Sequence, residues 1–100
     1  MSSATIPIIE AIRQRRLLAF AYHGGRRLVE PHTYGFDRLQ RELLCAYQVD
    51  GASRSGQNTG WKNFVVREVA DMRIDARHFD QPRPDYRRDD GAFARILAQL

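Results

Sequence analysis

The stretch that decides the fold reads LLAFAYHGGRRLVEP, over residues 17–31. Bulky side chains at positions 18, 20 and 22 alternate with smaller ones, and a period of two is typical of a β-strand. The pair Gly24-Gly25 supplies the positive φ angles of a tight turn, and the chain returns through residues 27–31 as a second strand. Pro31 lacks a backbone donor, so we expect it at an edge or a bend. Residues 17–31 therefore predict a β-hairpin.

Further strands follow the hairpin, and a helix is expected at each end of the chain. Residues 32–36 continue extended, and residues 42–49, 61–66 and 69–74 predict more strands. Residues 6–16 predict a helix, because isoleucines recur three positions apart and Thr5 is a candidate N-cap. Residues 75–79 fit one helical turn, and Asp89 or Asp90 is expected to cap a last helix over residues 91–100.

Length and composition limit the number of domains and the classes of protein to which this chain can belong. One hundred residues suffice for one domain, with a helix (6–16), a barrel or curled sheet (17–74) and a helical tail (75–100). The predicted fold class is mainly β with helices (α+β), as a small curled sheet or partly open barrel of about five antiparallel strands. The sequence has no apolar run that could span a membrane and no signal-peptide pattern, and one cysteine excludes an internal disulfide. We therefore expect a cytoplasmic protein.

The basic residues suggest an anionic partner. Sixteen Lys and Arg residues stand against twelve Asp and Glu residues, which gives a net charge of +4, and all but Lys62 are arginine. Arginine binds phosphate and carboxylate bidentately. In the tail, acidic neighbours largely cancel the arginines, and the excess lies before residue 49. This distribution suits a discrete anionic ligand better than a long polyanion.

Aromatic and basic side chains are interleaved on the predicted strands and their loops. The aromatic members are Tyr22, Tyr34, Tyr47, Trp61 and Phe64, and the basic members are Arg26, Arg27, Arg41, Arg54, Lys62 and Arg67. Such sheets hold single-stranded nucleic acid or a phosphorylated small ligand by phosphate pairing and base stacking. We expect Arg27 and Lys62 to contact phosphate or carboxylate, Tyr47 or Trp61 to stack, and Arg26 and Arg67 to flank the site. The alternative interpretation is that the aromatics are core and the arginines are solvated.

Nothing in the sequence predicts catalysis, a metal site or a cofactor. The histidines His23, His32 and His78 lack the spacing of a zinc site. Cys45 lies mid-strand between apolar residues, which indicates a small buried hydrophobe rather than a nucleophile. No serine has a nucleophile-elbow context, and the glycine pair opens a hairpin rather than a helix. We therefore predict that the chain is not an enzyme.

Taken in order, these pieces resemble the WYL domain, a bacterial ligand-sensing module. The resemblance runs from about residue 9 to residue 79. It is carried by Ala11-Ile12 in the first helix, the strand of residues 18–22, the glycine turn, Arg27 and Pro31 as Arg-x-x-x-Pro, Leu43-Leu44, Lys62-Asn63-Phe64, Val69 and Phe79. The name-giving Trp-Tyr-Leu falls on residues 42–44, of which only the leucine matches, and a family arginine falls on Glu68.

The resemblance implies a fold and a role. The fold would be an Sm-like, SH3-type β-barrel with an N-terminal helix. Family members bind nucleic acids or nucleotide-type ligands and switch an attached domain, often in transcription factors with a winged helix-turn-helix. Only about five residues precede the first helix here, so we expect the chain to act through a partner regulatory protein or as a free-standing sensor.

Two hypotheses of function follow. In the first, the chain is a non-enzymatic sensor or regulatory module, related to transcription regulation, that binds a nucleotide or single-stranded nucleic acid on its sheet. In the second, it is a structural or protein-interaction domain, plausibly a homodimer, that has lost the ligand site. The second is motivated by Glu42, Leu43 and Glu68, which stand at family ligand-pocket positions. The sequence leaves the role of the glycine-rich loop at residues 51–60 open.

Overall fold

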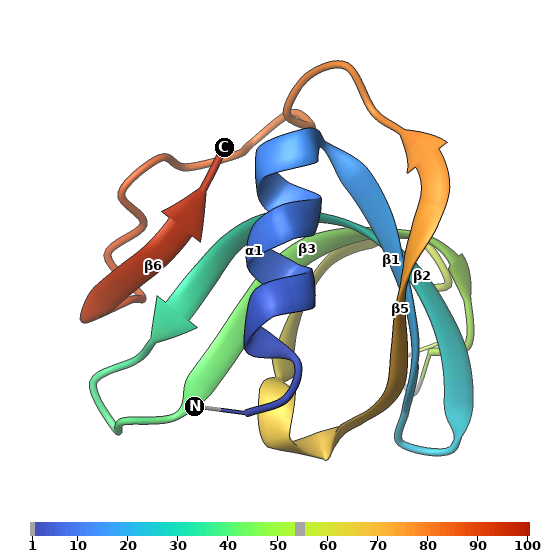
Figure 1. Cartoon of the computed structure of the whole chain (residues 1–100), viewed down its shortest axis with the longest axis horizontal. Coiled ribbons are helices and arrows are strands. Elements are labelled where there is room, and N and C mark those ends of the chain that lie inside the picture. The colour runs from blue at the N-terminus through green and yellow to red at the C-terminus, as the bar shows by residue number, and fades with distance from the viewer. Residues whose placement is uncertain (1, 54–55) are drawn as a thin grey trace.

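The computed structural model describes residues 2–53 and 56–100, and these form one antiparallel six-stranded sheet with one helix (Figure 1). The strand order is β4-β3-β2-β1-β5, and β6 pairs with the far end of β2. The fold is thus mainly β and compact. In chain order the elements are α1 (Thr5–Gln14), β1 (Arg16–Tyr22), β2 (Gly25–Phe36), β3 (Glu42–Gly51), β4 (Gly60–Val65), the 3-10 helix η1 (Val66–Glu68), β5 (Val69–His78) and β6 (Arg95–Gln99).

The predicted hairpin is confirmed, with a shift in the turn. In the β1–β2 ladder Leu18 lies opposite Val29 and Tyr22 opposite Gly25. The residues with positive φ are His23 (+49°) and Gly24 (+81°), not the two glycines. Gly25 is needed for space instead, because a Cβ built there would lie 2.3 Å from the Cβ of Ala52. The turn therefore begins one residue earlier than predicted.

Strand β2 changes partner at its proline, as the prediction of a bend at Pro31 requires. Up to Val29 it pairs with β1, and from Thr33 to Phe36 it pairs with β6 on that side. The ladder to β3 shifts register between Pro31 and Thr33, so the missing donor falls at a bulge. The bent β2 thereby joins the hairpin to the C-terminal part of the chain (Figure 1).

The predicted helical tail is wrong. Strand β5 runs to His78, so residues 75–79 form no helical turn, and residues 95–99 of the predicted last helix form β6. The apolar residues at 93, 96, 97 and 100 fit a helix face on their own. However, the end of β2 needs a partner for its backbone groups beyond β1, and β6 supplies one. Tertiary pairing has overridden the local pattern.

The N-terminal helix was predicted at nearly the right place. It spans Thr5–Gln14 and ends at Arg15, which adopts the left-handed conformation with φ +54°. The N-cap is Ala4 rather than Thr5, whose hydroxyl instead lies 2.8 Å from the Tyr34 hydroxyl. Helix α1 lies across the sheet (Figure 1) and contributes Ile8 and Ile12 to the core.

The sheet is strongly curved but not closed. Strands β4 and β5 stand at opposite ends of the strand order, and among the described residues no ladder joins them. The 3-10 helix η1 connects them directly. The core between sheet and helix includes Phe20, Tyr34, Leu44 and Phe64, each at most 1% exposed. In residues 2–53 and 56–100 no helix is long and apolar enough to cross a membrane.

Candidate functional site

The structure divides the six residues predicted to bind a ligand among separate places. Arg27 and Lys62 line one pocket of about 190 Å³, together with Tyr22, His23, Ser53, Asn63 and Phe64. Tyr47 and Trp61 lie opposite each other on β3 and β4 and make an edge-to-face pair, with ring centroids 5.7 Å apart. Arg26 and Arg67 line two other depressions of the surface. Arg27 and Lys62 therefore share one pocket, and Trp61 shares a second one, of about 230 Å³, with Lys62.

Arg27 is the buried charge of this pocket. The residue is 5% exposed, and its guanidinium carbon lies 5.5 Å from the ring centre of Tyr22 and 5.9 Å from that of Phe64. Nη1 donates to Oε1 of Gln48 and Nη2 to the carbonyl oxygen of Tyr22, each at 3.3 Å. Among the described residues, Nε has no hydrogen-bond partner and the guanidinium has no ion pair. A buried cation held only by neutral groups is costly.

Gln48 holds Arg27 in place, and sequence reasoning missed it. The residue is fully buried, and its Nε2 donates to the carbonyl oxygens of Ala52 (2.8 Å) and Asn58 (3.0 Å). One side chain thus connects the guanidinium with both sides of the loop after β3. A polar residue at an inward position of an otherwise apolar strand was the signal that could have identified it.

Lys62 lies at the rim of the pocket. Its Nζ donates to Oγ of Ser53 at 3.0 Å and to the carbonyl oxygen of Gln57 at 2.9 Å. The ammonium is therefore held against the loop after β3. Arg54, one of the basic residues that flank the predicted strands, lies outside the described residues.

Glu68, where the resemblance described above would place an arginine, binds the wall of this pocket. Glu68, in η1, pairs with Nε2 of His23, and the His23 ring stacks on Tyr22 with centroids 4.0 Å apart. Arg67, one residue earlier, is exposed on the same short helix and not on a strand. The acidic residue therefore orients the histidine of the pocket instead of contributing positive charge.

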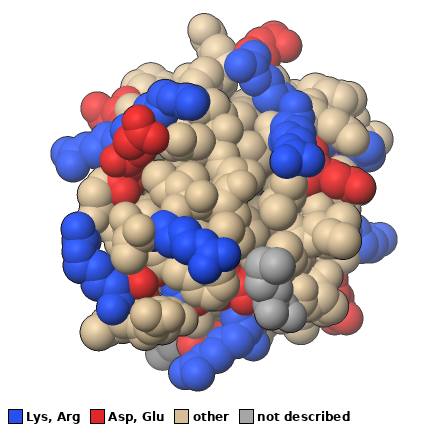
Figure 2. Space-filling view, turned by 60° about the vertical axis from the view of Figure 1, so that its left-hand side comes forward, with Lys and Arg blue, Asp and Glu red and all other residues tan. Residues whose placement is uncertain are grey.

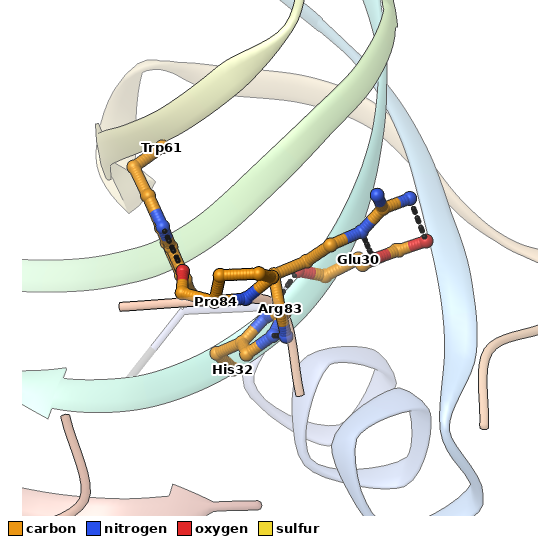
Figure 3. Close-up of polar contacts among 5 residues, drawn as sticks. All are labelled: Glu30, His32, Trp61, Arg83 and Pro84. Carbon is orange, nitrogen blue, oxygen red and sulfur yellow. Dashed lines mark hydrogen bonds and ion pairs between the residues drawn. The ribbon is translucent and has the colours of Figure 1, made fainter. Parts of the chain in front are cut away.

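Tyr47 and Trp61 are covered by the chain itself. We call residues 80–90 the strap, since they cross the sheet between β5 and β6. The Arg83 guanidinium lies over the Tyr47 ring, 4.5 Å from its centre, and Nε1 of Trp61 donates to the carbonyl oxygen of Pro84 at 2.9 Å (Figure 3). The two rings predicted to stack on a base thus have partners from the strap.

Two buried polar residues of β2 hold the strap, and neither was predicted. Glu30, 6% exposed, accepts two hydrogen bonds from Arg83, from Nε at 2.7 Å and from Nη2 at 3.0 Å. This pairing raises the pKa of Arg83. His32 is fully buried and receives the backbone N–H of Arg83 (Figure 3). Sequence reasoning gave no partner for residues 81–86.

Three of the predicted aromatic residues belong to the core, and Cys45 is half-buried. Tyr22, Tyr34 and Phe64 are buried, which confirms the alternative interpretation for these three rings. Burial, with a hydrogen bond to Glu42, raises the pKa of the Tyr34 hydroxyl. Burial likewise raises the pKa of the Cys45 thiol to about 11, so the group is protonated at neutral pH.

Charge on the molecular surface is mixed. On the face drawn in Figure 2, Lys and Arg side chains alternate with Asp and Glu around a largely uncharged centre. Arg41, for example, is paired with Asp37 at 2.8 Å. Within residues 2–53 and 56–100 there is no cluster of three His, Cys, Asp or Glu side chains that could hold a metal ion.

Comparison with known proteins gives no relative to argue from. A scan against protein-family models found no match, and searches of curated proteins and of solved structures found none. The candidate site therefore stands on its own geometry.

Proposed function

We propose that this chain is a non-enzymatic ligand-sensing and regulatory module that binds an anionic ligand, a nucleotide or single-stranded nucleic acid, through Arg27 and Lys62. In this proposal the fold is Sm-like, of the SH3 type, and the module is of the WYL kind, related to transcription regulation. It would signal through a partner regulatory protein. Support comes from the order of motifs along the chain together with the strongly curved sheet and its N-terminal helix.

The observation that carries the proposal is the buried, unpaired guanidinium of Arg27. Its Nε has no partner among the described residues, although the side chain lines a pocket. A phosphate or carboxylate group in that pocket would lie beside this cation and neutralise its charge, and interactions between opposite charges that share hydrogen bonds are stronger than neutral ones. Lys62 would supply the second cation at the rim.

The size of the pocket favours a nucleotide over single-stranded nucleic acid as the ligand. A volume of about 190 Å³ holds roughly six water molecules. Such a space accepts one phosphate or carboxylate group, with the remainder of the ligand outside it. A nucleotide therefore fits the pocket better than an extended strand, whose successive phosphates would need a longer basic groove.

Fluorescence anisotropy with a labelled nucleotide and a labelled single-stranded oligonucleotide tests this proposal. We expect binding that weakens with added salt, and a loss of about ten- to a hundredfold in Arg27→Ala, as for a charged hydrogen bond. Lys62→Ala should weaken binding less, because this group is closer to solvent. Arg26→Ala is the matched control, since Arg26 is exposed and lines another depression.

Two results would contradict the proposal. One is binding that Arg27→Ala and Lys62→Ala leave unchanged, and the other is no binding by the wild-type protein. Arg27→Lys, which keeps the charge while removing Nε, serves as a second variant if Arg27→Ala does not fold. The thermal unfolding curve of each variant shows whether it is folded.

A structural or protein-interaction domain is the second candidate, and specific surface features favour it. The strap covers Tyr47 and Trp61, while Ile6 and Leu39 are 68% and 72% exposed. Strand β5 pairs only with β1 among the described residues, so its other edge is open to a second copy of the chain. Light scattering would support this candidate if it gave a dimer in a protein that binds no anion.

A further inference from the structure

The middle of the strap, residues 81–85, is held to the sheet by a small number of polar contacts, through Arg83 and Pro84, between two fixed ends. At one end Phe79 is buried and its N–H donates to the carbonyl oxygen of Arg15 at 2.9 Å. At the other end Phe93 is buried, and the next N–H, of Ala94, donates to the carbonyl oxygen of Phe36 at 2.8 Å. Between these anchors most strap residues are exposed. Tyr86 and Arg88 donate to the carbonyl oxygen of Leu100, and Asp89 bonds to the side chain of Gln99 in β6. Only residues 81–85 can therefore lift without moving β5 or β6.

His32 is the central attachment point, and its partners fix its protonation state. Nδ1 lies 2.8 Å from the carbonyl oxygen of Glu30, so it must carry a proton and donate. Nε2 lies 3.1 Å from the backbone nitrogen of Arg83, so it must be unprotonated and accept (Figure 3). The strap therefore docks only on the neutral imidazole.

The surroundings of His32 also favour the neutral form. The charged groups that act on His32 are the carboxylate of Glu30 from β2 and the guanidinium of Arg83 from the strap. The rings of Trp61, Phe79 and Tyr86 pack against the imidazole. Burial is the largest influence and lowers the pKa of His32 from its ordinary value of 6.5, and Arg83 acts in the same direction. Glu30 opposes this shift, but its charge is already paired with Arg83.

We propose that the middle of the strap is a pH-sensitive latch, in which protonation of His32 breaks the bond to Arg83, releases residues 81–85 and uncovers Tyr47 and Trp61. A proton on Nε2 would place two N–H groups against each other at 3.1 Å, and this removes the acceptor without offering another. This inference goes beyond the proposed anion site and does not depend on it.

The direction of the pH effect follows from the two states of the imidazole. When the strap is released, His32 has its ordinary pKa, and when the strap is docked its pKa is lower. The ratio of docked to released strap is therefore constant at high pH and falls as the pH drops below about 6.5. Within that window the ratio falls about tenfold for each pH unit, until the pKa of the docked state is reached.

The single tryptophan of the chain reports the latch directly. Fluorescence of the full chain without ligand is followed from about pH 8 to about pH 5, with far-UV circular dichroism as a check on the fold. We expect Trp61 emission to move to longer wavelength below pH 6.5 while the β spectrum is retained. His32→Gln keeps an acceptor oxygen that does not titrate at these pH values, so its emission should stay constant. His78→Gln is the matched control, because His78 is exposed.

Three outcomes would overturn the latch. These are constant emission in the wild-type protein, an unchanged emission shift in His32→Gln, and loss of the β spectrum together with the shift. Should His32→Gln fail to fold, the ¹³C-labelled histidines of the wild-type protein are titrated by NMR. A pKa for His32 below that of His78, together with line changes at Trp61, supports the latch, and an ordinary pKa for His32 contradicts it.

Discussion

Arg27 and Glu30 are both buried charges on β2, three residues apart, and the protein treats them in opposite ways. Glu30, 6% exposed, has a bidentate partner in Arg83. Arg27, 5% exposed, has neutral acceptors for two of its nitrogens and no partner among the described residues for the third. One charge is satisfied within the chain, and the other is left incompletely satisfied beside a pocket.

This difference separates structural polar groups from binding groups. A paired buried charge loses stability when its partner is removed, because the remaining charge is then desolvated and alone. An unpaired buried charge lowers the stability of the free protein, so its removal carries little penalty. A ligand of opposite charge recovers that energy on binding. The two residues should therefore respond to mutation with opposite signs.

The largest effect is expected when the paired charge loses its partner. Arg83→Ala should reduce the free energy of unfolding by about 3 kcal/mol, because the Glu30 carboxylate stays buried without its counter-ion. Urea denaturation followed by circular dichroism measures the loss. Arg87→Ala, an exposed arginine of the same strap, is the control and should leave the curve unchanged. A loss equal to that of the control would show that Glu30 does not depend on this pair.

A smaller effect of opposite sign is expected at the unpaired charge. Arg27→Met keeps an unbranched side chain and removes the charge, so stability should be unchanged or higher by about 1 kcal/mol. The unpaired acceptor left on Gln48 limits this gain. The same urea experiment gives the stability, and anisotropy should show that anion binding is lost. A destabilisation close to that of Arg83→Ala would mean that Arg27 is a structural residue.

The sequence predicted well those parts of the fold that depend on local patterns. The alternation at residues 18–22 and the glycine turn gave the hairpin, and Pro31 marked the bend. It failed for the last helix, because the spacing of Phe93, Ile96 and Leu97 fits a helix as well as a strand. The deciding factor was the open side of β2 beyond residue 32, which only the folded sheet reveals.

The candidate site was also predicted only in part from the sequence. Arg27 and Lys62 were predicted from residue type and strand position, and the structure brings both to one pocket. Tyr47 and Trp61 were predicted to lie on strands, and in the structure they lie opposite each other on β3 and β4. Their cover was missed because Arg83 is 53 residues away from Glu30 in the chain. Gln48 and His32 were missed because a buried polar residue is recognised by its partners, and these are distant in sequence or in a loop.

The smallest effect is expected at an ion pair whose geometry resembles that of Glu30 with Arg83 but which lies at the surface. In Arg77 and Asp75, Nε lies 2.8 Å from Oδ1 and Nη2 lies 3.1 Å from Oδ2. The side chains are 64% and 23% exposed, so water solvates either group when the other is removed. Although the pair lowers the pKa of Asp75 to about 2, Arg77→Ala should shift the urea midpoint too little to resolve. Equal losses in Arg77→Ala and Arg83→Ala would show that geometry, rather than burial, sets the strength of these pairs.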